Sequence, residues 1–169
     1  MSSSPASIDA EYNSPNVVCR ITYTPLDSQS IIASVQDDGA GATAVFIGTT
    51  RNSFKSKVVT RLEYQAYSKL AIKTMTDIAN LVMQNTSRSQ HQPEGQCTPA
   101  IIKCAIHHRL GTVPVGEPSI VIAVSSPHRK EAFDACEEIL EQVKKKAQIW
   151  KREYYEGEDD ANAEWKTNA

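Results

Sequence analysis

Apolar and polar residues alternate in several short stretches of the chain, which is the pattern of half-buried β-strands. A short apolar run bounded by glycines, as at 42–48, predicts a buried strand. The expected strands are 17–23, 42–48, 58–67, 100–106 and 119–124. Glycine and proline predict turns at 37–41 and over Gly111 to Pro118, and the basic segment 51–57 is expected to be a mobile loop.

Spacings of three and four residues between apolar positions predict a first long helix. It is expected to begin at a capping Ser68. Its buried stripe would comprise Ala71, Met75, Ile78 and Val82. A shorter helix is expected within 27–36, capped by Asp27 or Ser28.

A second long helix is expected directly after Ser125 and Ser126, with Pro127 at its first helical position. The same apolar spacing predicts the side of this helix that faces the core. Its inner stripe would comprise Phe133, Cys136, Leu140 and Val143.

The strands and helices are interleaved irregularly, without a repeated strand–helix–strand unit. This order predicts an α+β fold, a sandwich of mainly antiparallel strands with two long helices. Residues 1–16 are rich in Ser, Pro and Asn and are expected to form a flexible tail. Residues 17–169 would then form a single domain, with the polar segment 86–99 as an inserted loop.

The composition is that of a globular protein of the cytosol. Hydrophobic residues make up 40% and charged residues 22% of the 169 positions, and a net charge of −2 gives no reason to expect nucleic acid. No apolar run approaches the roughly 20 residues of a membrane span. The first residues lack the apolar core of a secretory signal, and the four cysteines show no metal-binding spacing, so reduced thiols are expected.

The junction 125–129 (SSPHR) is the strongest local indication of a binding site. A helix N-terminus carries partial positive charge, so basic residues there are unfavourable unless an anion is bound. This chain places His128, Arg129 and Lys130 in that turn. Each cation there destabilises the helix by about 0.3–1 kcal/mol unless an anion offsets it. A solvated turn, partly compensated by Glu131, explains this motif equally well.

The segment 144–152 (KKKAQIWKR) contains a second group of cations. Lysines at a helix C-terminus are favourable, so a solvated helix end is the simpler interpretation of this segment alone. A helix that continued to residue 151 would nevertheless place Lys144 and Lys151 on one face, about two turns apart. Crowding among these cations would lower a lysine pKa and favour its use as a base or nucleophile.

Arg51 follows an apolar strand and could reach a ligand from the strand end, although an ordinary surface arginine is the simpler interpretation of this residue alone. His107 and His108 have no cysteine or carboxylate at metal-ligand spacing, which favours packing over metal binding.

Taken together, these segments resemble the large subunit of molybdopterin synthase, from about residue 39 to residue 165. The landmarks that carry the resemblance occur in order along the chain. They are GTTRN at 48–52, LEYQAY at 62–67, HRLG at 108–111, SSPHR at 125–129 with EAF at 131–133, and IWKRE at 149–153. Five ordered landmarks are far more specific than any one of them.

The resemblance implies an α/β-hammerhead fold and a homodimer at the centre of a heterotetramer. A small ubiquitin-like subunit at each end would insert a C-terminal Gly-Gly tail that carries a thiocarboxylate. Its sulfur would pass to cyclic pyranopterin monophosphate and form the dithiolene of molybdopterin. The chain would then be the catalytic sulfurtransferase subunit in molybdenum cofactor biosynthesis, with no cofactor or metal of its own and no membrane partner.

The resemblance also implies which residues form the site. Arg51, His128 and Arg129 would hold the substrate phosphate and pterin. Lys144 would be the main catalytic lysine, as an acid–base catalyst or a nucleophile, with Lys151 beside it in the pocket. The other residues expected at the site are Thr49, Thr50, Arg152 and Glu153, with Phe46 as support from the strand.

Gln148 departs from the family pattern, which usually has proline at this position. Proline would stop the helix, whereas glutamine permits it to continue, so the relative placing of Lys144 and Lys151 depends on this residue. The segment 86–99 is also longer and more polar than the family pattern.

Two functions from other classes are compatible with the same cations. A scaffold could bind a ubiquitin-like tail or a phosphorylated ligand without turnover. A phosphohydrolase is disfavoured, because no cluster of carboxylates that could bind a metal is visible in the sequence.

Overall fold

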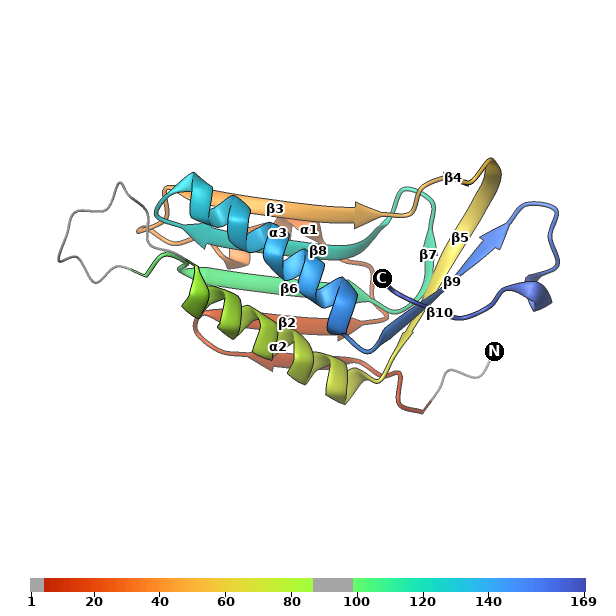
Figure 1. Ribbon diagram of the computed structural model, residues 1–169, viewed down its shortest axis with the longest axis horizontal. Coiled ribbons are helices and arrows are strands. Elements are labelled where there is room, and N and C mark those ends of the chain that lie inside the picture. Colours follow the sequence, from red (N-terminus) through yellow and green to blue (C-terminus); the bar gives the residue numbers. More distant parts are fainter. Residues whose placement is uncertain (1–4, 87–98) are drawn as a thin grey trace.

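The computed structural model describes residues 5–86 and 99–169, which form two β-sheets and three α-helices (Figure 1). The first sheet has the strand order β1-β2-β6-β8-β3. Its strands are β1 (Ala10–Asn13), β2 (Val17–Thr22), β3 (Ala42–Thr49), β6 (Lys103–Arg109) and β8 (Pro118–Ser126). The neighbours β2 and β6 run parallel, and the other neighbours run antiparallel.

The second sheet stands at one end of the first sheet, at the right of Figure 1. Its central strand β5 pairs with β4, β7 and β9, and β9 also pairs with β10. The strands are β4 (Ser53–Phe54), β5 (Lys57–Ala66), β7 (Gly111–Pro114), β9 (Ile149–Tyr155) and β10 (Lys166–Thr167). A short 3-10 helix, η1 (Asp160–Asn162), precedes β10.

The helices α2 (Ser68–Asn85) and α3 (Arg129–Lys146) cover one face of the first sheet and bury the main core against it. Met75 of α2 and Ile139 of α3 are completely buried there. Each side chain of this size contributes roughly 1.5–3 kcal/mol when it is removed from water. The short helix α1 (Ser28–Ser34) covers part of the other face through Ile31. Among the described helices, none is long and apolar enough to cross a membrane.

The expected α+β fold with two long helices is confirmed, and so is the first helical stripe, because all four of its residues are buried. The stripe expected for the second helix is partly wrong. Phe133 is 65% exposed, whereas Ala132, Ala135 and Ile139 are buried with Cys136 and Val143. The buried face of α3 is therefore centred to one side of Phe133.

The helix starts also differ from expectation, except that Asp27 caps α1 by accepting a hydrogen bond from the Ser30 backbone. Ser68 is the first residue of α2, and its buried hydroxyl accepts from the backbone N–H of Ile8 at 3.0 Å instead of capping the helix. The N-cap of α3 is His128, so Pro127 lies just before the helix.

The expected flexible tail 1–16 is wrong over β1, because Ala10–Asn13 pairs with β2 along its whole length. The Tyr23 hydroxyl also donates to the Ser7 carbonyl at 2.9 Å and ties this segment down further. Of the inserted loop expected at 86–99, residues 87–98 lie outside the described part of the chain, as do residues 1–4 of the tail.

Three further expectations are wrong in part. The strand expected to be buried at 42–48 is instead the edge strand β3, in which Val45 is 37% and Ile47 40% exposed. The expected loop 51–57 contains β4 and a tight hairpin turn, with φ of 47° at Lys55 and 65° at Ser56. The expected turn after Gly111 contains β7, which pairs with β5.

Candidate active site

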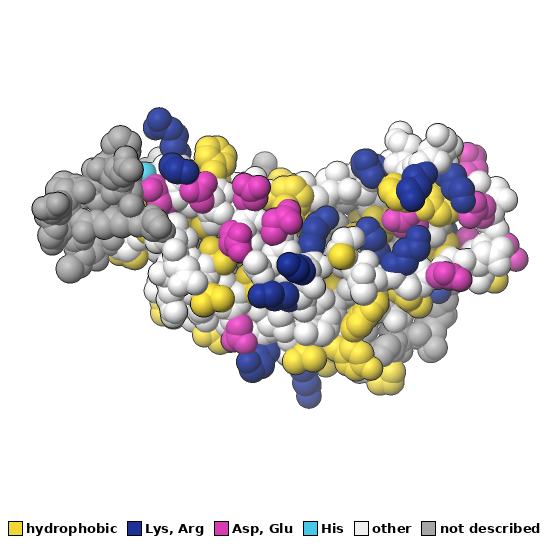
Figure 2. All heavy atoms as spheres, in the orientation of Figure 1, with side chains coloured by type: hydrophobic (Ala, Val, Ile, Leu, Met, Phe, Trp, Pro, Cys, Tyr) yellow, Lys and Arg dark blue, Asp and Glu magenta, His cyan; other side chains and the backbone are white. Residues whose placement is uncertain are grey.

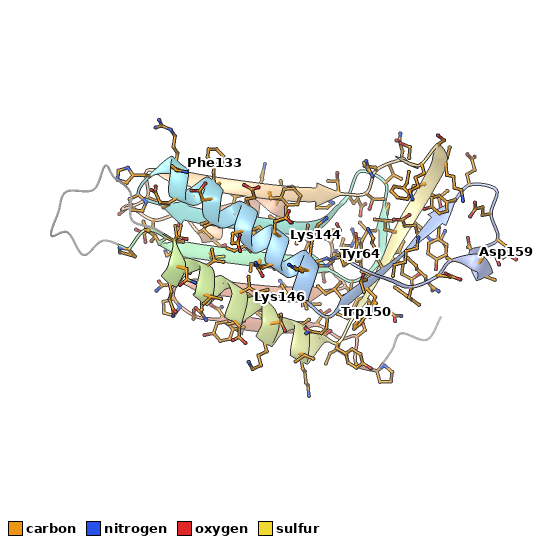
Figure 3. The ribbon with its side chains drawn as sticks, viewed as in Figure 1. Tyr64, Phe133, Lys144, Lys146, Trp150 and Asp159 are labelled. Atoms are coloured by element: carbon orange, nitrogen blue, oxygen red, sulfur yellow. The ribbon has the colours of Figure 1, made fainter. Side chains whose placement is uncertain are left out.

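A pocket of about 190 Å³ lies where the two sheets meet the C-terminal end of α3. Tyr64 and Lys144 mark it in Figure 3, where they approach each other from β5 and α3. Strands from both sheets line it, so the pocket exists only because the second sheet stands across the end of the first. Its lining includes Phe46, Gly48, Thr49, Arg51, Tyr64, His108, Ser119, Lys144, Lys151, Glu153 and Asn168.

Gly48 forms the part of the wall where β3 ends. A Cβ atom at this position would lie 2.8 Å from Cγ2 of Ile120, which also lines the pocket, so a side chain here would collide with the pocket wall. The register of β3 against β8 shifts between Gly48 and Thr49. Such a bulge bends the strand and changes the direction of the residues that follow it, which here include Arg51.

Three cations and one carboxylate converge on the pocket: Arg51, Lys144, Lys151 and Glu153. Lys151 lies opposite Tyr64 in the register of β5 with β9, and strand alternation places Glu153 on the same face. The Lys151 Nζ atom is 3.9 Å from Glu153 Oε1, and these two side chains are only 25% and 10% exposed. A pocket with this excess of positive charge favours an anionic ligand.

The continued helix that would have aligned Lys144 with Lys151 is wrong. The helix α3 ends at Lys146, Ala147 is its C-cap in an extended conformation, and β9 begins at Ile149. Gln148 therefore does not extend the helix, although it could have done so. The two lysines still line one pocket, because β9 begins only three residues after the end of α3 and both elements border the pocket.

The pKa of Lys151 is lowered from its ordinary value. Partial burial is the main cause, and the positive charges of Lys144, Lys166 and Arg51 act in the same direction, while Glu153 opposes them. The expected effect of crowding is thus present, on the strand lysine. A lowered pKa increases the fraction of free amine near neutral pH, which is the form that can accept a proton.

The floor of the pocket is a buried polar group that the sequence analysis did not identify as part of the site. The Asn168 amide nitrogen donates to Nε2 of His108 at 3.2 Å, and the opposite ring nitrogen of His108 donates to the Arg109 carbonyl at 2.8 Å. Burial lowers the pKa of His108 to about 4, so the ring is neutral. The Tyr64 ring packs edge-on against it with a centroid distance of 4.9 Å.

His108 is thus packed in the core against Tyr64, as expected from the sequence. Among the described residues, no three His, Cys, Asp or Glu side chains are grouped so that they could hold a metal ion. The HRLG landmark contains His108, but no local signal pointed to Asn168, which follows β10 far from His108 in the sequence.

Two residues expected to line the site lie elsewhere. Thr50 is buried, and its hydroxyl donates to the Val113 carbonyl at 3.3 Å, so it holds the strand end in place. Arg152 lies on the opposite face of β9 from Lys151, where it forms an ion pair with Glu63 at 3.1 Å. The alternation of side chains along a strand makes it impossible for both Lys151 and Arg152 to face the pocket.

His128 and Arg129 are also separated from the pocket. They lie at the N-terminal end of α3, about 22 Å along the helix axis from Lys144. There they line a larger groove between α2 and α3, of about 1100 Å³, together with Glu131, Asp134 and Glu138. Figure 2 shows acidic side chains over this part of α3, whereas basic side chains gather towards the second sheet. One chain therefore does not bring all the expected site residues together.

Comparison with known proteins gives one consistent family. A family model described as MoaE protein matches residues 21–146. A molybdopterin synthase catalytic subunit from Aspergillus niger is 42% identical over 153 residues, which cover 90% of this chain and 76% of the relative. The corresponding protein from Phaeosphaeria nodorum is 47% identical over 150 residues, with 88% and 71% covered.

Solved structures agree with this result. Molybdopterin synthase from Staphylococcus aureus has a TM-score of 0.72 and 29% identity, with 86% of this chain and 94% of that chain covered. A protein–protein complex of subunits 1 and 2 of molybdopterin-converting factor from Helicobacter pylori has a TM-score of 0.63, with 83% and 86% covered. At 20% identity, the second similarity shows a shared fold.

Proposed function

The chain belongs to the MoaE protein family, and from this membership we propose how its pocket serves the reaction of molybdopterin synthase. Its function is that of the catalytic subunit of this enzyme, a sulfurtransferase in molybdenum cofactor biosynthesis. The observation that carries the proposed mechanism is the convergence of Arg51, Lys144 and Lys151 in one pocket.

In this proposal, the sulfur donor is the C-terminal thiocarboxylate of a small ubiquitin-like subunit, and the acceptor is cyclic pyranopterin monophosphate. Both molecules are anionic, and both fit a pocket in which three cations face a single carboxylate. The Helicobacter pylori structure of the same fold is a complex of two subunits, which supports a small partner for this chain as well.

The roles of the cations follow from their chemistry and surroundings. The Arg51 guanidinium is suited to hold the substrate phosphate through two parallel hydrogen bonds. Lys144 extends from the last turn of α3 towards the reacting groups and is the main catalytic lysine. Lys151, with its lowered pKa, accepts a proton during sulfur transfer, and Glu153 holds its side chain in place.

The separation of His128 and Arg129 from the pocket is explained if the active unit is a homodimer. The two residues cannot reach a ligand bound beside Lys144 of the same chain, because α3 is a rigid helix between them. In a two-fold dimer, the second copy supplies its His128 and Arg129 to the pocket of the first, and the exchange is reciprocal. The phosphate site is then built from both copies.

A reconstituted turnover assay tests the proposal. It combines this chain with a thiocarboxylated small subunit and cyclic pyranopterin monophosphate, and molybdopterin is measured by the fluorescence of its oxidised product. Lys144→Ala is expected to lower turnover by about 10²–10⁴-fold, the usual contribution of a general acid or base. Lys145→Ala is the matched control, since Lys145 is an exposed neighbour on α3 that does not line the pocket.

Full activity of Lys144→Ala would contradict the role of this lysine. A stable complex of the two subunits without any product, even from the wild-type chain, would instead favour the non-catalytic scaffold. Retained subunit binding by Lys144→Ala would show that a loss of turnover comes from the chemistry rather than from assembly.

A further inference from the structure

Three connections between the two sheets lie next to one another beside the pocket (Figure 1). The segment 50–52 joins β3 to β4, Leu110 joins β6 to β7, and the segment 115–117 joins β7 to β8. An isolated β-bridge links the first of these connections to the third. Arg51, which lines the pocket, lies in the first connection. Its position therefore depends on how firmly the connections are held together.

Backbone hydrogen bonds hold the residues on both sides of Arg51. The N–H of Thr50 donates to the Glu117 carbonyl at 3.2 Å, and the Thr50 carbonyl accepts from the N–H of Gly116 at 2.9 Å. On the other side, the Asn52 carbonyl accepts from a backbone N–H of β5 at 2.9 Å. Arg51 thus lies between one residue held by the connection to β8 and one held by the second sheet. A shift of the connection to β8 would reach Arg51 directly through Thr50.

An ion pair fixes the connection that holds Thr50. Nη1 of Arg109, the last residue of β6, donates to Oε2 of Glu117. The side chain of Arg109 is 9% exposed, whereas that of Glu117 is 46% exposed. Nε of Arg109 is buried and has no hydrogen-bond partner among the described residues, so the compensation of this buried charge depends on Glu117. The ion pair therefore anchors the connection to β8 to the end of β6 in the first sheet.

We propose that Glu117, paired with Arg109, is a positioning residue for Arg51 and keeps its guanidinium at the pocket for the substrate phosphate. This inference rests on the proposed function for the identity of the ligand. Neither Glu117 nor Arg109 lines the pocket, so both act through Arg51 without contacting the ligand. A group that binds a ligand performs best when the residues behind it fix its position in advance. An ion pair with a structural role alone would change the stability of the chain and leave the affinity for the phosphate unchanged.

Steady-state kinetics in the turnover assay measure this effect. Glu117→Gln is expected to raise KM for cyclic pyranopterin monophosphate by about tenfold, the lower end of the loss of a charge-assisted hydrogen bond. The kcat should stay within about twofold, because the phosphate is bound equally before and during sulfur transfer. Glu158→Gln is the matched control and should leave KM unchanged, since Glu158 forms an ion pair with Lys57 and is similarly exposed, at 44%.

A double-mutant cycle shows whether Glu117 acts through Arg51. Arg51→Ala should itself raise KM, and Glu117→Gln in the Arg51→Ala background should cause no further increase. Effects that multiply, or an unchanged KM in Glu117→Gln alone, would overturn the inference. If Glu117→Gln does not fold, the double variant Arg109→Met/Glu117→Gln replaces it with the same expected KM, because it leaves no uncompensated buried cation.

The backbone order parameter of Arg51, from ¹⁵N relaxation, tests the positioning without turnover. Glu117→Gln should lower it from about 0.85, the value of rigid backbone, to below about 0.6, whereas Glu158→Gln should not. An unchanged order parameter would overturn the inference even if the enzyme turns over normally. A wild-type chain without turnover, in which Glu117→Gln still lowers the order parameter of Arg51, would overturn the proposed function alone.

Discussion

The two ends of α3 carry the same kind of residue in opposite surroundings. At the C-terminal end, Lys144 joins Lys151 and Arg51 in a pocket with a buried floor and a single carboxylate. At the N-terminal end, His128 and Arg129 lie on an open groove among several acidic side chains. The first end has three cations against one carboxylate, whereas at the second end the basic residues share a larger groove with Glu131, Asp134 and Glu138.

The difference shows that residues belonging to one family signature need not meet within one chain. Within a single copy, a rigid helix holds Arg129 and Lys144 apart. Electrostatics supports the same view, because the pocket end has an excess of positive charge that a ligand would neutralise, whereas the cations of the other end are balanced locally. Lys130, for example, is paired with Asp134 at 3.0 Å.

The largest expected effect comes from mixing two inactive variants. Lys144→Ala and Arg129→Ala should each lose most turnover alone, since each removes one half of every site. Dissociated and reassociated together, they should recover about a quarter of wild-type turnover, because half of the dimers are mixed and each mixed dimer has one intact site. The turnover assay after mixing at equal concentration measures this recovery, and mixed proteins that stay inactive would mean that each site is built within one copy.

The next effect distinguishes the two lysines of the pocket. Lys151→Met should reduce turnover by about a hundredfold or more if its free amine is the base. Because activity would require the deprotonated form, turnover should rise with pH through the lowered pKa of Lys151. Removing the neighbouring anion in Glu153→Gln lowers this pKa further and shifts the rise to lower pH, whereas removing a cation in Lys166→Met shifts it to higher pH.

The pH–rate profiles of these two variants provide their own control, since their shifts have opposite signs. Shifts in the same direction, or none, would show that the observed rise belongs to another group.

A smaller effect concerns the stability of the pocket floor. The pKa of His108 is lowered from 6.5 to about 4 by burial, so below pH 6.5 the unfolded chain binds a proton that the folded chain excludes. Stability should therefore fall as the pH decreases from 6.5 towards 4, by roughly 2 kcal/mol between pH 7 and pH 5 for this residue. His108→Gln should lose correspondingly less over this interval in urea unfolding. Equal losses in both proteins would assign the acid sensitivity to other groups.

The smallest expected effect is that of Gln148→Pro, which introduces the residue that the family resemblance led us to expect at this position. Ala147 already has φ of −70° and ψ of 141°, the conformation that a following proline requires. The change removes a hydrogen bond of 2.9 Å from the Thr74 hydroxyl to the Gln148 side chain and reduces the entropy of the unfolded chain. The free energy of unfolding should change by less than about 1 kcal/mol, and a larger loss would show that Gln148 has a role of its own.

Much of the fold could be predicted from the sequence, because β2, β5, β8 and the stripe of α2 show the spacing of their own secondary structure. The strands β1 and β7 could not, because both are short, and β7 in addition depends on β5, which is distant in the sequence. The end of α3 was equally difficult to predict. Neither Ala147 nor Gln148 stops a helix, so tertiary packing must determine where the strand begins.

The site residues could be identified only in part. The family resemblance gave Arg51, Lys144 and Lys151, which do share a pocket. Arg152 could have been excluded once β9 was recognised as a strand, since it alternates with Lys151. The place of Asn168 at the site could not be predicted, because it depends on the return of the chain to His108 through β10. The landmarks also do not give the distance between Arg129 and Lys144, because the length of α3 sets it.

The length of α3 also constrains how this chain can change during evolution. Each inserted residue would advance the helix by about 1.5 Å and rotate everything beyond it by about 100°, so His128 and Lys144 would lose their mutual orientation. Substitutions on its outer face, at Glu137 or Glu141 for instance, leave that orientation unchanged. Homologous sequences should therefore vary freely in residue type along this face, while the number of residues between the two ends of the helix stays constant.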